Sequence, residues 1–153
     1  MKNQKIAEKS FSEFQRALNK KLIECQKGDI HDDIIVHIDK PQGKVRFTYG
    51  LIGAESRLKA FCVVMPSNPY KGKPCFDIGL ATLEKFRRQG YGKSILQKSI
   101  DELKNGLSRN GITEFYIELK VDSGNEASHN LCRKFSDEVI ENEKSRIYLK
   151  LIK

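Results

Sequence analysis

The first periodic stretch of the chain predicts an amphipathic helix from Ser10 to about Gln26. Its apolar side chains recur every three or four residues, which places them on one face of a helix. They are Phe11, Phe14, Leu18, Leu22 and Cys25. Ser10 and Glu13 have the spacing of a capping box at the start, and Gly28 begins the polar stretch that ends the helix.

Short runs of β-branched and aromatic residues then replace the helical period and predict strands. Residues 34–38 and 45–49 form the first two strands, and Pro41-Gln42-Gly43 between them indicates a hairpin. A third strand is expected at about residues 58–65. The stretch from Pro66 to Pro74 holds three prolines and a glycine, so we expect an irregular loop there.

A strand, a glycine-containing turn and a helix follow as one unit in the middle of the chain. The strand spans Phe76 to Leu83 and runs directly into the turn. The helix extends from about Tyr91 to Leu107 with its apolar residues along one side, and Asn110-Gly111 ends it.

The rest of the chain predicts a strand at 115–121, a short helix at 125–135, and a hairpin with strands around Val139 and at 146–152. The crossover from Phe76 to Val121 favours two parallel neighbours in an otherwise antiparallel sheet. The predicted fold class is therefore mixed α/β, of the α+β kind, with a mostly antiparallel central sheet, one parallel central pair and flanking helices. A length of 153 residues fits one domain, residues 1–153.

Composition narrows the class of protein. Charged residues make up 31% and hydrophobic residues 39% of the chain, which is typical of a folded globular protein. We find neither an apolar run long enough to cross a membrane nor an apolar leader after Met1, so we expect a cytosolic protein without a membrane partner. The four cysteines are too scattered for a disulfide framework or a zinc site, so we expect reduced, mostly buried thiols and no metal.

The basic balance adds a hint about partners. Lys and Arg number 28 against 20 Asp and Glu, a formal charge of +8, which attracts nucleic acid, acidic proteins and phosphorylated cofactors alike.

The turn between strand and helix carries the candidate chemistry. Its residues are Arg87, Arg88, Gln89, Gly90, Tyr91, Gly92, Lys93 and Ser94. The amides at the start of a helix lack intrahelical partners, glycines let the backbone approach a ligand closely, and basic side chains add positive charge. The turn is therefore predicted to bind phosphate.

Spacing separates three phosphate-binding motifs. A P-loop ending in Gly92-Lys93-Ser94 needs glycine where Arg87 stands, and a dinucleotide fingerprint needs glycine where Ile95 stands. The remaining pattern, R-x-x-G-x-G, resembles the coenzyme A pyrophosphate motif of the GNAT superfamily of N-acetyltransferases. The preceding stretch Leu80 to Arg87 resembles the family's strand exit, and Leu119-Lys120-Val121 with Asn125-Glu126-Ala127 resembles its next strand and helix start.

This resemblance implies a cofactor, acetyl-CoA, and roles for particular residues. Leu80 and Thr82 would lend backbone groups to the pantetheine arm and thioester, with the parallel pair splayed around the cofactor. The amide of Leu80 would stabilise the oxyanion. Arg87 to Ser94 would hold the pyrophosphate, and Asn125 would lie near the lower part of the cofactor.

The proton-transfer groups depart from the family pattern. Many members have a tyrosine where this chain has Cys132, and some have a glutamate where it has Phe76. Asp77 should point to the face opposite Phe76 unless a bulge turns it. We therefore assign the general base to Glu118, acting through water. A solvated strand carboxylate is an equally good interpretation of Glu118.

Three further side chains offer alternatives. Tyr148 could serve as an acid, although an aromatic residue in a terminal strand usually packs in the core. His129 and Cys132 lie three residues apart on one helix and could face each other as a nucleophilic pair, which is more often a coincidence.

The predicted function is transfer of an acetyl group from acetyl-CoA to an amine of a small-molecule or macromolecular acceptor. Net charge mildly favours an acidic acceptor. One alternative is a CoA-binding module of the same fold with impaired catalysis, and another is a nucleic-acid-directed protein, which is not favoured because aromatic residues are not interleaved with the basic ones. Both a monomer and a homodimer are compatible with the sequence.

Overall fold

The computed structural model describes residues 2–53, 57–82, 90–122, 126–141 and 145–153, without the side chains of residues 2–8, 81, 82, 122 and 126–128. In chain order the elements are α1 (Lys2–Asn19), β1 (Gln26–Lys27), β2 (Ile34–Asp39), the 3-10 turn η1 (Pro41–Gly43), β3 (Arg46–Ile52), β4 (Leu58–Tyr70), β5 (Lys73–Thr82), α2 (Tyr91–Ser108), β6 (Phe115–Asp122), α3 (Glu126–Phe135), β7 (Glu138–Glu141) and β8 (Ser145–Ile152). This order confirms the predicted alternation of elements, with the two-residue β1 added.

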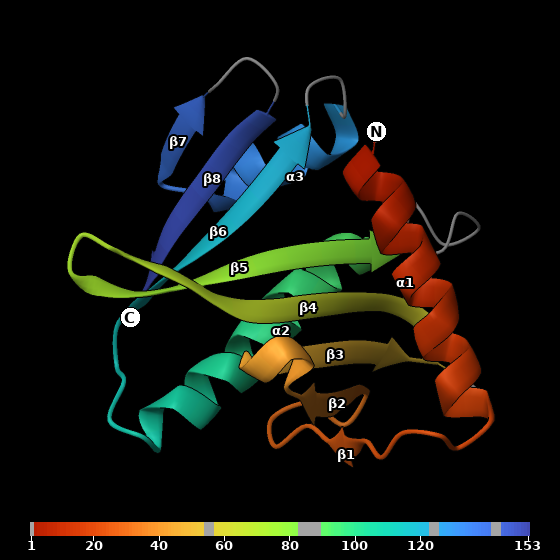
Figure 1. The fold of residues 1–153 in the computed structure, drawn as a ribbon. Coiled ribbons are helices and arrows are strands. Elements are labelled where there is room, and N and C mark those ends of the chain that lie inside the picture. Colours follow the sequence, from red (N-terminus) through yellow and green to blue (C-terminus); the bar gives the residue numbers. More distant parts are fainter. Residues whose placement is uncertain (1, 54–56, 83–89, 123–125, 142–144) are drawn as a thin grey trace.

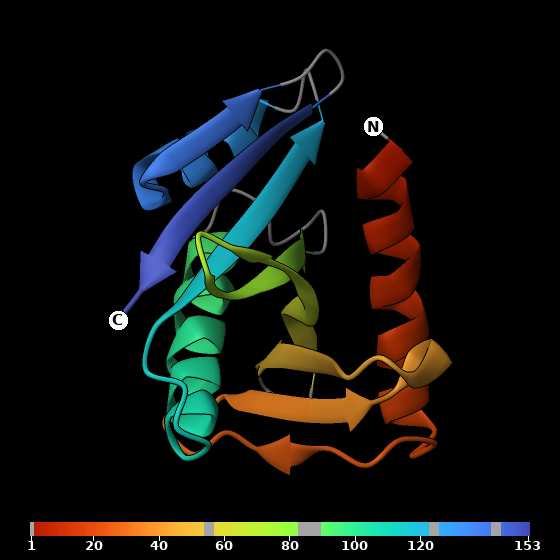
Figure 2. The same cartoon turned by 60° about the vertical axis from the view of Figure 1, so that its left-hand side comes forward.

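One sheet organises the described chain. Its eight strands lie in the order β1-β2-β3-β4-β5-β6-β8-β7, and α1 crosses the face opposite to α2 (Figures 1 and 2). All recorded strand pairs are antiparallel except β5 with β6, which are parallel and joined through α2. The predicted fold class, including its parallel central pair, is confirmed.

Each face of the sheet has its own apolar core. The residues of α2 that point to the sheet are Ile95, Leu96, Ile100 and Leu103, and they join buried residues of β3 to β6 and β8 in the main cluster. On the opposite face, Phe11 of α1 packs edge to face on Phe61 of β4, with ring centroids 5.5 Å apart. Burial of these two helix faces is what fixes α1 and α2 on the sheet.

The limits of α1 differ from the predicted ones. The helix begins at Lys2, so Ser10 lies within it and caps nothing, and it ends at Asn19. Lys21 adopts a left-handed φ of 55°, the amide of Lys21 donates to the carbonyl of Leu18, and that of Leu22 donates to that of Ala17. These two bonds form a Schellman motif, which ends a helix without glycine here. Leu22 is consequently 72% exposed instead of facing the core.

The loop expected from Pro66 to Pro74 is wrong, because β4 and β5 continue through this stretch as a hairpin (Figure 1). Lys71 and Gly72 both have positive φ, as a two-residue type I′ turn requires. The recorded pairing of β3 with β4 ends at Val64, so the prolines beyond it occupy strand edges and a register shift, where a missing amide is tolerated. We call residues 65–70 and 73–76 the arm.

The arm lies across β6 and is tied to β7. The ring of Tyr70 meets that of Tyr116 edge to face, with centroids 4.9 Å apart. The Tyr70 hydroxyl and the Lys71 ammonium both donate to Oε1 of Glu138, at 3.1 and 2.7 Å. Cys75, Tyr116 and Leu149 form a small core beneath this contact.

A second long-range tie joins the segment before β2 to α2. The buried carboxylate of Glu102 accepts hydrogen bonds from the amides of Ile30 and His31, at 3.0 and 2.9 Å. A Cβ at Gly28 would lie 2.3 Å from Glu102 Oε2, so only glycine fits there without a shift. Among the helices in the described ranges, none is long and apolar enough to span a membrane.

Candidate functional site

The two parallel strands part in the middle of the sheet. Residue pairs between β5 and β6 run from Cys75–Tyr116 to Ile78–Leu119, whereas β5 continues to Thr82 and β6 to Asp122. Gly79 is the first residue of β5 past the last pair, and no described atom lies within 4 Å of where its Cβ would be. Leu80 and Thr82 therefore lie on the parting side of β5, where strand edges can pair with an extended ligand.

The start of α2 has the geometry of an anion site. Gly90 has a left-handed φ of 82°, and no described atom lies within 4 Å of a Cβ built there. Tyr91 begins the helix, and the Ser94 amide donates to the Gly90 carbonyl. Gly92, Lys93 and Ser94 follow in the first turn, where helix amides point outward and the dipole favours an anion. Arg87, Arg88, Gln89 and Asn125 fall outside the described residues.

Lys59 is a further basic residue near this turn, and no sequence motif marks it. Its Nζ donates to the Tyr91 hydroxyl at 3.2 Å and lies 4.9 Å from the centre of the Tyr91 ring. Antiparallel pairing sets the start of β4 beside the end of β5, as in the pair Ala60–Thr82, and so brings Lys59 to α2. Only strand register reveals this neighbour, and register was not readable from the sequence.

Two carboxylates share one face of the sheet where the strands part. Asp77 and Glu118 are register partners on the parallel strands, so both side chains point to the face that carries α1. Asp77 points away from Phe76, as expected. The sequence did not indicate that Asp77 and Glu118 would be neighbours on the same face. Partial desolvation and the charge of Glu118 raise the pKa of Asp77, while Lys120 acts in the opposite direction.

Ser67 of the arm binds Glu118 directly. The Ser67 hydroxyl donates to Oε1 of Glu118 at 2.6 Å. Ser67 could not be selected from the sequence, because the prolines around it predict an irregular loop. No local signal marks the contact, which joins residues 51 positions apart.

The other candidate proton donors belong to the core. Cys132 is buried in the main cluster, and burial raises its pKa to about 12, so its thiol is a poor acid at neutral pH. Phe76 packs edge to face on Phe115, with centroids 5.6 Å apart. Tyr148 and His129 are both buried, and the Tyr148 hydroxyl lies 2.7 Å from Nδ1 of His129. His129 is thus bonded to Tyr148, and Tyr148 packs in the core.

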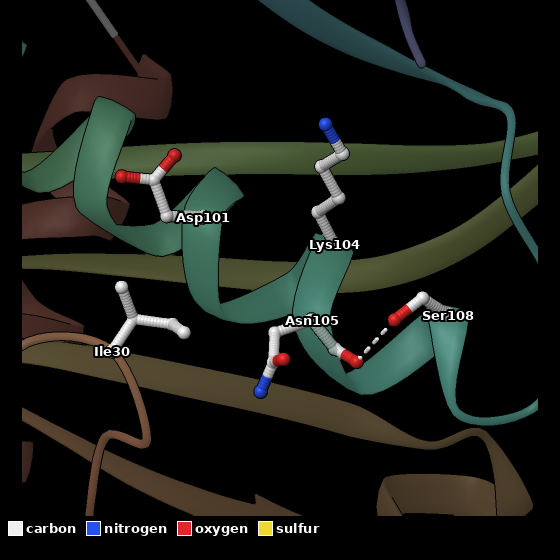
Figure 3. Close-up of a pocket in the computed structure, with 5 residues that line it drawn as sticks. All are labelled: Ile30, Asp101, Lys104, Asn105 and Ser108. Atoms are coloured by element: carbon white, nitrogen blue, oxygen red, sulfur yellow. Dashed lines mark hydrogen bonds between the residues drawn. The ribbon is translucent and has the colours of Figure 1, made fainter.

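A shallow pocket of about 360 Å³ lies elsewhere, over the C-terminal half of α2 (Figure 3). It is lined by Ile30, Asp101, Lys104, Asn105 and Ser108. The Ser108 hydroxyl donates to the Asn105 carbonyl, and Asp101 lies 2.9 Å from the His31 ring. Asp101, Asn105 and Ser108 thus make local contacts, and the pocket lies well along the helix from Gly90. Among the described residues there is no cluster of His, Cys, Asp and Glu that could hold a metal ion.

These features fit a cofactor with a diphosphate and an extended thioester tail. The start of α2 offers amides and the Lys93 charge to the diphosphate, and the parted strands offer backbone groups to the tail. The carboxylates of Asp77 and Glu118 belong to the pair that precedes the last recorded pair of β5 and β6.

Comparisons with known proteins agree with this geometry. The model of the acetyltransferase (GNAT) family matches residues 11–136. No curated protein matches the chain in sequence.

Solved structures show the same fold. An acetyltransferase of the GNAT family from Streptococcus pneumoniae is 14% identical with a TM-score of 0.52, covering 72% of this chain and 67% of that one. A ribosomal-protein-alanine N-acetyltransferase from Brucella melitensis is 16% identical with a TM-score of 0.51, covering 68% and 67%. NAA60 of Arabidopsis thaliana in complex with acetyl-CoA is 14% identical with a TM-score of 0.52, covering 69% and 74%.

The family model spans most of the chain and includes both the parted strands and the start of α2. The chain therefore belongs to the acetyltransferase (GNAT) family, whose members use acetyl-CoA as the acyl donor.

Proposed function

We propose that this chain is an acetyl-CoA-dependent N-acyltransferase, which moves an acetyl group to an amine. The observation that carries the proposal is the parting of β5 from β6 beside a left-handed glycine at the start of α2. We further propose that residues 1–153 act as one catalytic domain, and a cytosolic location stays a prediction from the sequence.

On the donor side, the proposal assigns the diphosphate to Arg87 through Ser94, with Lys59 as an added positive charge. Backbone groups of Leu80 and Thr82 pair with the pantetheine arm, and Asn125 lies near its lower part. The Leu80 amide donates to the thioester oxygen and stabilises the charge that develops there. Support comes from the position of Leu80 just past the last β5–β6 pair.

On the acceptor side, Glu118 acts as the general base through a water molecule. Acetyl-CoA would supply the acetyl group, and Glu118 would accept the proton that the amine loses as its nitrogen bonds to the acetyl carbon and the carbon–sulfur bond breaks. Solvent would supply the proton for the departing sulfur, since the raised pKa of Cys132 makes that thiol a poor donor. The neighbouring Asp77 adds negative charge that attracts an amine arriving as an ammonium ion.

The acceptor class follows from local and overall charge together. The carboxylates favour a primary amine at the reacting position, and the net charge of +8 mildly favours acidic groups elsewhere on the acceptor, whether it is a small molecule or a macromolecule. A nucleic acid stays a disfavoured partner.

Thermal unfolding with acetyl-CoA, CoA and ATP tests the cofactor site. Ligand at about a hundred times its Kd stabilises by about 2.7 kcal/mol, which raises the Tm of a domain of this size by about 5 to 10 °C. We expect this shift with both CoA forms, and a much smaller one in Gly90→Glu. Gly111→Glu is the matched control, because Gly111 has a φ of 81° and equally open surroundings away from the site. Equal Tm shifts in Gly90→Glu and Gly111→Glu would show that the turn at Gly90 does not bind the cofactor.

Release of CoA with a panel of primary amines tests the chemistry. Glu118→Gln should lower kcat by about 100-fold or more, while the thermal shift with acetyl-CoA stays at the wild-type value. An unchanged kcat would remove Glu118 from the mechanism.

A second candidate function is a CoA-binding module that has lost catalysis. Phe76 and Cys132, which stand where relatives carry proton-transfer groups, favour it, since both are packed in the core. A full thermal shift with acetyl-CoA but no CoA release with any amine would support this candidate. Turnover by the wild type eliminates it.

A further inference from the structure

We propose that Ser67 is a positioning residue for proton transfer, and that the arm delivers it to Glu118. This inference rests on the proposed function for the role of Glu118 as the base. It goes further by assigning a task to a hairpin that lies outside the cofactor site.

The contact depends on the shape of the arm. In the sheet, Ser67 pairs with Cys75 of β5, and Cys75 in turn pairs with Tyr116 of β6, so β5 separates β4 from β6. The Ser67 hydroxyl nevertheless reaches Glu118 of β6 at 2.6 Å. The arm must therefore bend over this face, and the register shift between Ser67 and Tyr70 marks the irregular part of the bend.

The arm is fixed on both sides of Ser67. Before Ser67, the pairs Met65–Asp77 and Pro66–Phe76 hold the backbone in the ladder. At the tip, Tyr70 packs on Tyr116, and Tyr70 and Lys71 both donate to Glu138 of β7. Because the arm is fixed on either side of Ser67, the Ser67 backbone loses little conformational freedom when its hydroxyl bonds to Glu118. The hydroxyl can therefore orient the carboxylate.

The hydrogen bond acts on the carboxylate through its orientation, because it restricts Glu118 to one rotamer. The titratable groups of β5 and β6 on this face are Asp77, Cys75, Tyr116 and Lys120. At the end of the arm and on β7 the titratable groups are Tyr70, Lys71 and Glu138. The register partner on β8 is the apolar Leu149, and the described apolar residues of α1 pack on β4.

A first experiment measures the orientation of Glu118 without any substrate. Three-bond NMR couplings report the χ1 rotamers of Glu118 in the wild type, in Ser67→Ala and in Ser67→Thr. We expect one dominant rotamer in the wild type and in the threonine variant, and averaging in the alanine variant. Ser108→Ala serves as the control, because it removes a serine hydroxyl at the end of α2 and leaves the arm unchanged. A single rotamer in Ser67→Ala would overturn the proposal.

A second experiment uses turnover with the best amine of the panel. Ser67→Ala should lower kcat about tenfold with an unchanged KM for acetyl-CoA, and Ser67→Thr should restore it. A fall in kcat with a similar change in the KM for acetyl-CoA, or no rescue by threonine, would show a merely structural role and overturn the proposal.

The two experiments separate this inference from the proposed function. Absence of a thermal shift with acetyl-CoA overturns the cofactor site, whereas the NMR couplings judge Ser67 independently of it. An unaffected Glu118→Gln variant removes the base, and the positioning role falls with it.

Discussion

At the residue scale, Asp77 shows how a neighbour changes the chemistry of a strand carboxyl. Its partial desolvation and the adjacent Glu118 raise its pKa above the ordinary value of 3.8. The folded state therefore holds the protonated carboxyl better than the unfolded chain does. The resulting stabilisation is fully present below about pH 4, near the unfolded pKa, and is lost as the pH rises through the folded pKa.

Asp77→Asn should remove this pH dependence. As the pH rises from about 4 to 7, the free energy of unfolding of the variant should increase relative to that of the wild type. The increase should be about 0.5 kcal/mol or less, because the side chain is exposed. Urea unfolding at both pH values measures the change. The exposed Asp32→Asn is the control, and equal behaviour of the two variants would contradict the account.

Cys132 occupies the position where many family members have a tyrosine, but it is buried in the apolar core. Cys132→Ala should keep the kcat of the wild type, because a thiol whose pKa is raised to about 12 does not supply the proton. The same change should lower the free energy of unfolding by about 1 to 2 kcal/mol through the small cavity it leaves. Kinetics and chemical unfolding test the two parts, and a large loss of kcat without loss of stability would make Cys132 a catalytic residue.

The residues of the site divide by how far apart their partners lie in the sequence. The glycine turn could be proposed as a phosphate site because its residues are contiguous and its spacing excludes other phosphate motifs. Glu118 could be proposed as the base because it lies on the strand that follows this turn and its helix. Ser67, Lys59 and the pairing of Asp77 with Glu118 could not, because each depends on which strand residues oppose one another.

At the element scale, the tie between Glu102 and the segment before β2 makes a strong prediction about stability. Glu102→Ala should lower the free energy of unfolding by about 2 to 3 kcal/mol, because two amides lose their charged acceptor. Gly28→Ala should act through the same contact, since its Cβ would lie 2.3 Å from Glu102 Oε2. Chemical unfolding of the double variant should show less than the sum of the single losses. Strict additivity would show that the two residues act separately.

The elements that the sequence predicted well are those whose own patterns set their limits. Residues 91–107 have a helical period between a glycine turn and Asn110-Gly111, and α2 spans Tyr91–Ser108. The arm forms strands although its prolines predict a loop. Its outer edge needs no ladder bonds past Val64, so the missing proline amides are tolerated there. The end of α1 was misplaced because a lysine, Lys21, takes the left-handed position that glycine usually fills.

At the scale of the whole molecule, the positive charge should be visible in the salt dependence of cofactor binding. A net charge of +8 and an anion site at the start of α2 both attract the phosphate groups of acetyl-CoA. The Tm increase with acetyl-CoA should therefore shrink between about 50 and 500 mM NaCl, as screening shortens the Debye length from about 14 Å to about 4 Å.

Lys59→Ala should weaken this salt dependence, since it removes a charge held near Tyr91. Lys44→Ala, an exposed lysine after η1, is the matched control. A cofactor shift that does not respond to salt in the wild type would contradict an electrostatic contribution to binding.

The sheet is held together across its middle by four residue pairs, Cys75–Tyr116 to Ile78–Leu119. Beyond them the strands have already separated, so a thioester tail can enter without breaking any recorded β5–β6 ladder bond. The arm meanwhile links β4 and β5 to β6 and β7 by a route that avoids this gap. The arm therefore connects the strands at the paired end of β5 and β6, away from the gap. We expect a tail that binds in the gap to leave these connections unchanged.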